Sequence, residues 1–379
     1  VAVGSLALDA NTTADHNTAV GKSALSSSTT GAENTALGSN ALTNLTTGTH
    51  NIAIGFVALD TVTTGDNNVA VGNEALQKTT TADNNTAVGF QALEENTTGS
   101  ENVAFGTFAL DASATASRNT AIGHNALSDN TGGSELVAVG FNALVSNTTG
   151  SYSVAMGRSA LDNVTSGSEN IGIGYHGGGG ITTGSDNICI GQDAGDDITT
   201  GNNNIVIGKS CDGGTSSAAQ RIVIGQAIDG VGNNYFTFGK TNHRVYNQFT
   251  SNASWTRSSD VRLKKDIQTN TDLGLNFIND LRTVTYKWKA PSEIDSNLSG
   301  YDATKTEADY ANKMYGFIAQ EVKQSLDNHN VTDFAGWTTD NEDIQGISYE
   351  MFVMPLVKAV QELSAENTAL KARLDAAGL

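Results

Sequence analysis

The segment Asn51-Ile52-Ala53-Ile54-Gly55 carries the pattern that decides the fold of this 379-residue chain. Its glycine returns every seventeen residues, fourteen times without a slip. The glycines are Gly4, Gly21, Gly38, Gly55, Gly72, Gly89, Gly106, Gly123, Gly140, Gly157, Gly174, Gly191, Gly208 and Gly225. A fixed internal period of this kind indicates stacked structural units, each in contact with its neighbours. Such folds form rods and binding surfaces more readily than buried active sites.

The residues around each glycine predict a short strand. Counted from Val1, position 1 is β-branched in all fourteen repeats, position 2 is Ala in ten, and position 3 is a large apolar residue in all. β-branched residues suit a pleated surface, and neighbouring strand residues point to opposite faces. Turn residues such as Thr97-Thr98-Gly99 and a closing Asn supply the corners. We therefore predict a mainly β protein whose residues 1–239 form a parallel β-roll, or solenoid, of fourteen turns.

The alternation also predicts a surface for other chains. If the bulky residues at positions 1 and 3 fill the roll, the alanine column lines a smooth outer face that suits close packing against another copy. Cys189 and Cys211 stand where Ala is usual, and they lie out of phase on adjacent turns. We expect them to act as small apolar residues rather than as a disulfide.

Composition excludes several classes of function. Lys and Arg number 21 against 40 Asp and Glu, giving a net charge of −19. This balance argues against nucleic-acid partners and anionic membrane surfaces, and no apolar run reaches the roughly 18 residues needed for membrane insertion. The six histidines show no ligand spacing, so we predict no metal and no cofactor. The chain begins at Val1 inside a repeat, and we expect further sequence upstream.

The last third has a different character. Residues 240–258 break the period and are predicted to be a connector, and residues 259–379 have a mixed α/β composition. Near the C-terminal end of this last third, apolar residues recur at alternating spacings of three and four residues. This spacing predicts a coiled-coil helix over about 349–376. The predicted trimerisation residues are Leu356, Val360, Leu363, Asn367, Leu370 and Leu374, with Tyr349 and Val353 opening the seam. Asn367 would fix the register, and Pro355 should mark the first turn or a kink. The alternative is a helix packed within one chain.

The repeats resemble a known family of surface proteins. Segments such as Asn51-Ile52-Ala53-Ile54-Gly55 are similar to the head repeats of trimeric autotransporter adhesins, although those repeats are typically shorter than seventeen residues. The resemblance implies a left-handed parallel β-roll that associates as a homotrimer.

Three marks in the last third resemble a second family. They are Ser259-Asp260-Val261-Arg262-Leu263-Lys264, then Tyr315-Gly316-Phe317-Ile318-Ala319-Gln320-Glu321-Val322, then Ile347-Ser348-Tyr349 before the closing helix. Together they are similar to the intramolecular chaperone and self-cleaving domain of phage tailspikes, tail fibres and neck appendages, the S74 peptidases. The resemblance covers residues 259–379. It implies a domain that trimerises, drives folding of the fibre ahead of it, and then cuts itself off.

That resemblance also implies roles for single residues. Ser259 would be the nucleophile, Lys264 its general base, and Asp260 the first residue of the released piece. A lysine whose pKa is lowered by burial can accept a serine proton in place of histidine. Lys265 is adjacent, and the family spacing favours Lys264. The enzyme activity would be a single-turnover autoproteolysis. The alternative is that Ser259 and Lys264 are ordinary exposed residues of a retained, inactive domain.

These features favour a virion tail fibre or appendage for host attachment, with a host cell-surface receptor, glycan or protein, as partner besides itself. One alternative is a bacterial surface adhesin, extracellular on the cell surface, whose C-terminal domain trimerises without cleavage. Another is a glycan-degrading tailspike with its enzymatic part upstream.

Overall fold

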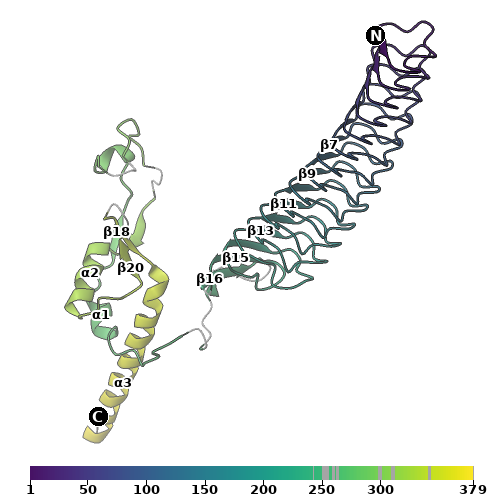
Figure 1. The fold of residues 1–379 in the computed structure, drawn as a ribbon. Coiled ribbons are helices and arrows are strands. Elements are labelled where there is room, and N and C mark those ends of the chain that lie inside the picture. The colour runs from purple at the N-terminus through teal and green to yellow at the C-terminus, as the bar shows by residue number, and fades with distance from the viewer. Residues whose placement is uncertain are drawn as a thin grey trace. The chain divides into compact units, whose positions relative to one another are not determined.

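The computed structural model divides the chain into two compact units, Val1–Leu263 and Lys264–Leu379 (Figure 1). It describes residues 1–241, 243–249, 256–257, 261, 264–297, 301–308, 312–339 and 343–378.

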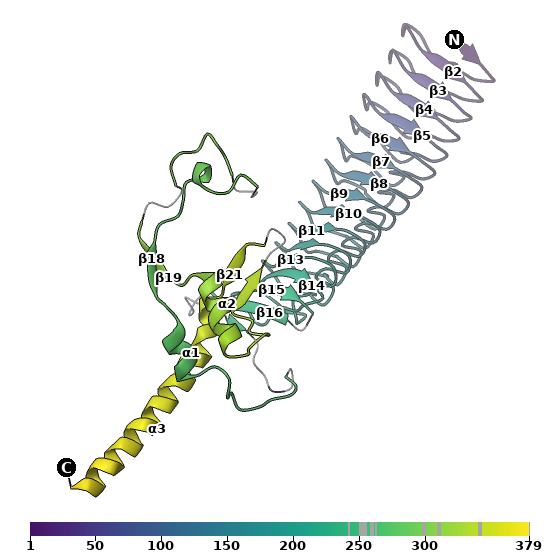
Figure 2. The same ribbon diagram turned by 90° about the vertical axis from the view of Figure 1, so that its left-hand side faces the viewer.

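The first unit is a parallel β-solenoid with a seventeen-residue repeat, as the sequence predicts. Each coil contributes one short strand, and each strand pairs in parallel with the next, as in Ala36 opposite Ala53. Figures 1 and 2 show the coils stacked with their strands in file. The strands are β1 (Ala2–Val3), β2 (Thr18–Val20), β3 (Thr35–Leu37), β4 (Ile52–Ile54), β5 (Val69–Val71), β6 (Thr86–Val88), β7 (Val103–Phe105), β8 (Thr120–Ile122), β9 (Val137–Val139), β10 (Val154–Met156), β11 (Ile171–Ile173), β12 (Ile188–Ile190), β13 (Ile205–Ile207) and β14 (Ile222–Gln226).

The two faces of each strand are reversed relative to the prediction, which is wrong on this point. The alanine column faces the interior, where Ala53 and Ala87 are fully buried, and the bulky residues face outward, where Phe105 is 57% exposed. The reason is the width of the coil. Leucines at position 8, such as Leu59, already fill the interior, and only a methyl group fits opposite them.

These leucines require an unusual backbone. In the coil after β3, Asn40, Leu42 and His50 have φ of 60°, 54° and 59°, the left-handed region. Such residues cost about 1 kcal/mol each. Hydrogen bonds between coils offset the cost, since Leu42 N–H donates to the carbonyl of Ala58 at 3.1 Å.

The glycine that recurs every seventeen residues has two physical causes. Gly55 has a φ of 146°, which side-chain-bearing residues rarely adopt. A Cβ added there would also collide with the carbonyl oxygen of Gly72 in the next coil. Every coil therefore needs glycine at this corner.

A buried asparagine ladder joins the coils at position 17. The main-chain N–H of Asn51 donates to Oδ1 of Asn34 at 2.9 Å, and Asn51 Nδ2 donates to the carbonyl of Gly65 at 2.8 Å. Both amides are fully buried. Buried amides that are satisfied in this way hold neighbouring coils together.

The interior of the roll stays filled in the late coils, where the sequence pattern becomes irregular. Gly178 and Gly195 replace the position-8 leucine, and Ile181, Ile198 and Cys189 are fully buried in the same interior. The volume lost at one position is regained at others, which cores tolerate well. The two cysteines are both free and buried.

The sheet continues into the stretch predicted to be a connector. β15 (Tyr235–Lys240) pairs in parallel with β14, placing Gly225 opposite Gly239 at a spacing of fourteen residues. β16 (His243–Gln248) and β17 (Thr256–Arg257) then add antiparallel strands. Arg221 ends the asparagine ladder, and its guanidinium bonds Asn233 Oδ1 at 3.0 Å.

The second unit is a small α/β fold with a terminal helix. Its elements are α1 (Leu275–Asp280), β18 (Val284–Tyr286), η2 (Pro291–Glu293), β19 (Met314–Gly316), α2 (Ala319–Asn328), β20 (Trp337–Thr339), β21 (Gln345–Ile347), η3 (Tyr349–Phe352) and α3 (Val353–Ala377). β18 pairs with β19 and β20 with β21, both antiparallel. The core centres on Phe277 and Phe352, whose rings stack at 6.2 Å. Pro355 lies in the first turn of α3.

Candidate functional site

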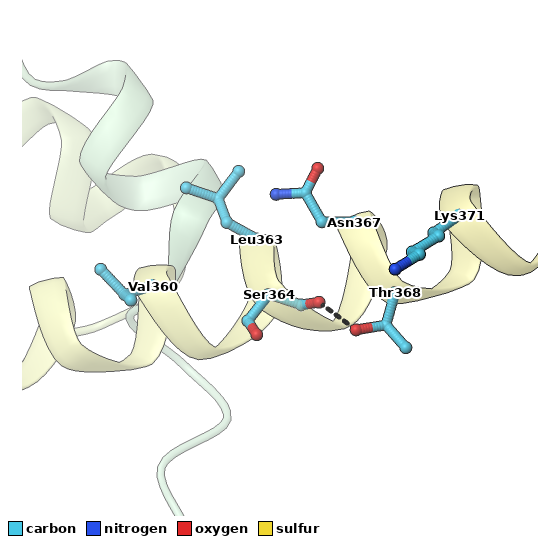
Figure 3. Close-up of a pocket in the computed structure, with 6 residues that line it drawn as sticks. All are labelled: Val360, Leu363, Ser364, Asn367, Thr368 and Lys371. Atoms are coloured by element: carbon cyan, nitrogen blue, oxygen red, sulfur yellow. Dashed lines mark hydrogen bonds between the residues drawn. The ribbon is translucent and has the colours of Figure 1, made fainter.

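The helix α3 presents an apolar seam to solvent. Its predicted seam residues are all exposed, with exposed fractions of 64% for Val360, 43% for Leu363 and 51% for Leu370. Leu356, Asn367 and Leu374 are exposed as well. Figure 3 shows Leu363 and Asn367 projecting from the same side of the helix, beside Val360. We call these six residues the α3 seam.

The seam is more exposed than the side of α3 that packs on its own unit. Pro355 and Ala359 are the buried residues of α3, and every residue from Leu363 to Gly378 is exposed. Glu362 makes the polar contact with α1, since its Oε2 accepts from the main-chain N–H of Leu275 at 2.7 Å. This hydrogen bond lowers the pKa of the Glu362 carboxyl. Isolated helices of roughly 12–15 residues are marginal in water, so we expect the exposed far half of α3 to gain stability from a partner.

The exposed apolar surface at the start of α3 extends beyond the α3 seam. Met354 and Val357 are 64% and 44% exposed, and they flank the seam residue Leu356. The signal lies in the sequence, where apolar residues at 353, 354, 356, 357 and 360 form a broad helical stripe.

The structure brings two of the three sequence marks together. Tyr349 Oη accepts a hydrogen bond from the main-chain N–H of Phe317 at 3.1 Å, and the two rings stack at 5.8 Å. A Cβ on Gly316 would collide with the same phenol oxygen, so glycine allows the approach. Tyr349 lies in η3, just before α3, and its hydroxyl makes this contact within the second unit.

The Tyr315–Val322 mark also contacts the segment that follows α1. Glu321 of α2 forms an ion pair with Arg282, whose Nε donates to Glu321 Oε2 at 3.1 Å while Nη2 bonds the other oxygen. Two parallel hydrogen bonds of this kind fix orientation as well as distance. Sequence spacing carried no signal for this pair.

The structure describes only part of the predicted cleavage site. Ser259 and Asp260 lie outside the described residues. Lys264 is described and exposed, and it begins the second compact unit. The roles of Ser259, Asp260 and Lys264 stay predictions.

The described residues also bear on metals and membranes. Among them, no cluster of three or more His, Cys, Asp or Glu side chains could hold a metal ion. In the same part of the chain, no helix is both long and apolar enough to cross a membrane.

Comparison with known families adds an independent assignment. Residues 259–331 match the peptidase S74 family, described as the chaperone of endosialidase. The match begins at Ser259 and includes Lys264 and the Tyr315–Val322 mark, and it covers about a fifth of the chain. Searches of curated proteins and of solved structures found no match. A chaperone-of-endosialidase domain behind a seventeen-residue-repeat β-solenoid fits a tail fibre with a C-terminal chaperone.

Proposed function

We propose that this chain is the repeat shaft of a virion tail fibre or appendage that attaches to a host surface, and that its second unit assembles three copies. The single observation that supports assembly most strongly is the α3 seam, which is mostly apolar and exposed, on a helix whose buried residues are Pro355 and Ala359. The family match at 259–331 supports the same role.

The roll itself explains why an assembly device is useful. Most coils offer the next one the same alanine, leucine and asparagine contacts, as Asn51 and Asn68 illustrate. Three such rolls that slip by one coil would lose little contact locally, so off-register traps are expected. A trimeric helix bundle at one end would fix the register of the three chains before their rolls associate.

The proposed last step is removal of the second unit. Lys264 takes the proton of the Ser259 hydroxyl, the hydroxyl oxygen attacks a main-chain carbonyl at the junction, and water completes hydrolysis of one peptide bond. Asp260 then becomes the new N-terminus. A shaft cut from the unit that assembled it unfolds slowly, because its assembly route is lost.

A denaturing gel of the full chain tests the cleavage. We expect wild type to yield two fragments, the smaller about a third of the chain, and Ser259→Ala and Lys264→Ala to stay whole. Lys265→Ala is the matched control and should still be cut. A wild-type chain that stays whole would remove the protease claim and favour the surface adhesin with a retained trimerisation domain.

A further inference from the structure

The outward side of the roll's strands is an unbroken, uncharged strip. Positions 1 and 3 of the fourteen coils hold Val, Ile, Leu, Met, Phe and four Thr, and no charged residue. None of these side chains is buried within one chain, and Leu37, Phe105 and Met156 are 47%, 57% and 45% exposed. Parallel pairing keeps the strip continuous, since Phe105 lies opposite Ile122 of the next coil. We call the residues at positions 1 and 3 the outer strand face.

The outer strand face is larger than the apolar patches of ordinary monomers. Fourteen strands spaced roughly 4.8 Å apart make it about 65 Å long. At a width of about 10 Å, its area of about 650 Å² exceeds the largest patch of a typical monomer and approaches the roughly 800 Å² that each partner buries in a stable interface. The size of this face therefore fits a contact between proteins.

Charged side chains begin just outside the face. Glu101, Arg118 and Glu135 each lie two residues before a strand and are exposed. Arg118 pairs with Glu135 along this flank, with 2.7 Å between Nη2 and Oε1. An apolar centre with a polar rim is the usual anatomy of a protein–protein interface.

The repeat itself indicates what covers the face. The apolar groups recur once per coil, so a partner keeps contact along the whole strip only if its own apolar groups recur at the same spacing. A second copy of the roll has that spacing along its full length. The α3 seam favours the same partner, because a bundle with cyclic symmetry presents the same surface of every copy to the others.

We propose that the outer strand faces of three copies pack against one another, parallel and in register coil by coil. This inference rests on the proposed assembly and names the surface by which the rolls themselves associate. The outer strand face then has the role that the sequence analysis expected of the alanine column, which is buried inside each roll.

Three large residues set the register of the packed rolls. Position 3 is Val or Ile in eleven coils, and Leu37, Phe105 and Met156 are the exceptions. They lie four and three coils apart, so their spacing does not repeat. In register, each meets the same residue of the other copies. A slip by one coil would set Phe105 against the smaller Val88 or Ile122 and leave the packing uneven.

Thiol labelling of the full chain tests whether the face is covered. Ile122→Cys, made together with Ser259→Ala, puts a thiol where a single chain leaves the side chain 39% exposed. The two native cysteines are buried, so a maleimide reports on the new thiol. We expect Ile122→Cys to react about tenfold more slowly than the control Thr98→Cys, which lies at an exposed turn residue.

The register residue is tested by heat. Phe105→Ala should lower the melting temperature of the trimer by about 5 °C, because the side chain is buried only when copies pack. Phe56→Ala is the matched control, since Phe56 is 52% exposed but lies beyond the glycine corner, off the face. Equal melting temperatures for the two variants would overturn the role of Phe105.

Light scattering on the labelled samples separates this proposal from the proposed assembly. A trimer in which Ile122→Cys reacts as fast as Thr98→Cys overturns the packing of the outer strand faces and leaves the assembly standing. A folded single chain overturns both. If Ile122→Cys stays protected in a trimer that also carries Leu363→Asp, the rolls associate without the α3 seam, which supports this proposal and contradicts the role given to α3.

Discussion

The carboxylate of Glu362 on α3 accepts a hydrogen bond from the main-chain N–H of Leu275, with 2.7 Å between Oε2 and the nitrogen. The contact joins the start of α1 to a helix 87 residues further along the chain. A Cβ on Gly274 would collide with the same carboxylate, so the preceding glycine makes room for it. This bond, with buried Pro355 and Ala359, fixes which side of α3 faces its own unit and leaves the α3 seam outward.

Glu362→Gln should make the second unit less stable at neutral pH. The bond to Leu275 holds the pKa of the Glu362 carboxyl below its ordinary value of 4.5. A group with a lowered pKa stabilises the fold above its unfolded value and loses that effect as the pH falls through the folded value. Tryptophan fluorescence reports mainly on this unit, since Trp288 and Trp337 lie in it and the third tryptophan, Trp255, precedes it. The unfolding midpoints of variant and wild type should differ at pH 7 and converge at low pH.

Glu366→Gln is the control for that change, one helical turn further along and fully outside the contact with α1. Equal effects of the two substitutions at pH 7 would contradict the role given to Glu362.

Gly55→Ala should destabilise the roll by about 2–4 kcal/mol, because a side chain must adopt a disfavoured φ and displace a neighbouring coil. The carbonyl of Gly72 blocks the added Cβ. Gly132→Ala is the matched control, since the nearest atom to its added Cβ is 4.0 Å away and its φ is not left-handed. Thermal unfolding followed by far-ultraviolet circular dichroism measures both. If the Gly55 and Gly132 variants unfold at the same temperature, the steric explanation is wrong.

Asp212→Asn should stabilise the roll at high pH and change little at low pH. Burial, together with the nearby Asp197, raises the pKa of the Asp212 carboxyl from 3.8 to about 8. The folded state therefore holds a proton that the unfolded chain releases, so wild-type stability falls as the pH rises from about 4 to about 8. Asparagine keeps the acceptor for the main-chain N–H groups of Asp197 and Gly213, which lie 2.9 Å from Oδ1.

Melting temperatures at pH 4 and pH 9 check this expectation, with Asp129→Asn as the control because Asp129 is exposed. A variant no more stable than wild type at pH 9 would show that burial of Asp212 carries no cost.

Leu363→Asp should break the association of chains without unfolding them. Leu363 belongs to the α3 seam and is 43% exposed, so a charge there costs little in one chain and much in a packed helix bundle. Ala365→Asp places the same charge on the same exposed stretch, outside the seam. Sedimentation should show smaller particles for the first variant and unchanged particles for the second. The same particle size for both variants would place the contact elsewhere.

The sequence predicts the period, the strand in each coil and the need for glycine, because each follows from local preferences repeated fourteen times. It misplaces the two strand faces, because alternation at Ile52, Ala53 and Ile54 distinguishes two faces without saying which is inside. The width of the interior decides that, and it depends on Leu59 in a left-handed conformation that no leucine favours by itself.

The candidate site likewise has features that the local sequence predicts and contacts that it does not. The heptad spacing of the α3 seam is local and could be found from the sequence. The contact between Phe317 and Tyr349, and that between Leu275 and Glu362, join residues 32 and 87 positions apart. Only the packed fold brings such pairs together. The Ser259 and Lys264 roles stay predictions.

The mass of the uncleaved full chain in solution tests the central claim most directly, namely that the second unit brings three copies together. Ser259→Ala keeps the two units joined, and light scattering after size exclusion gives the mass. The account predicts three times the mass of one chain, at concentrations down to the micromolar range. A stable, folded particle with the mass of a single chain would contradict it.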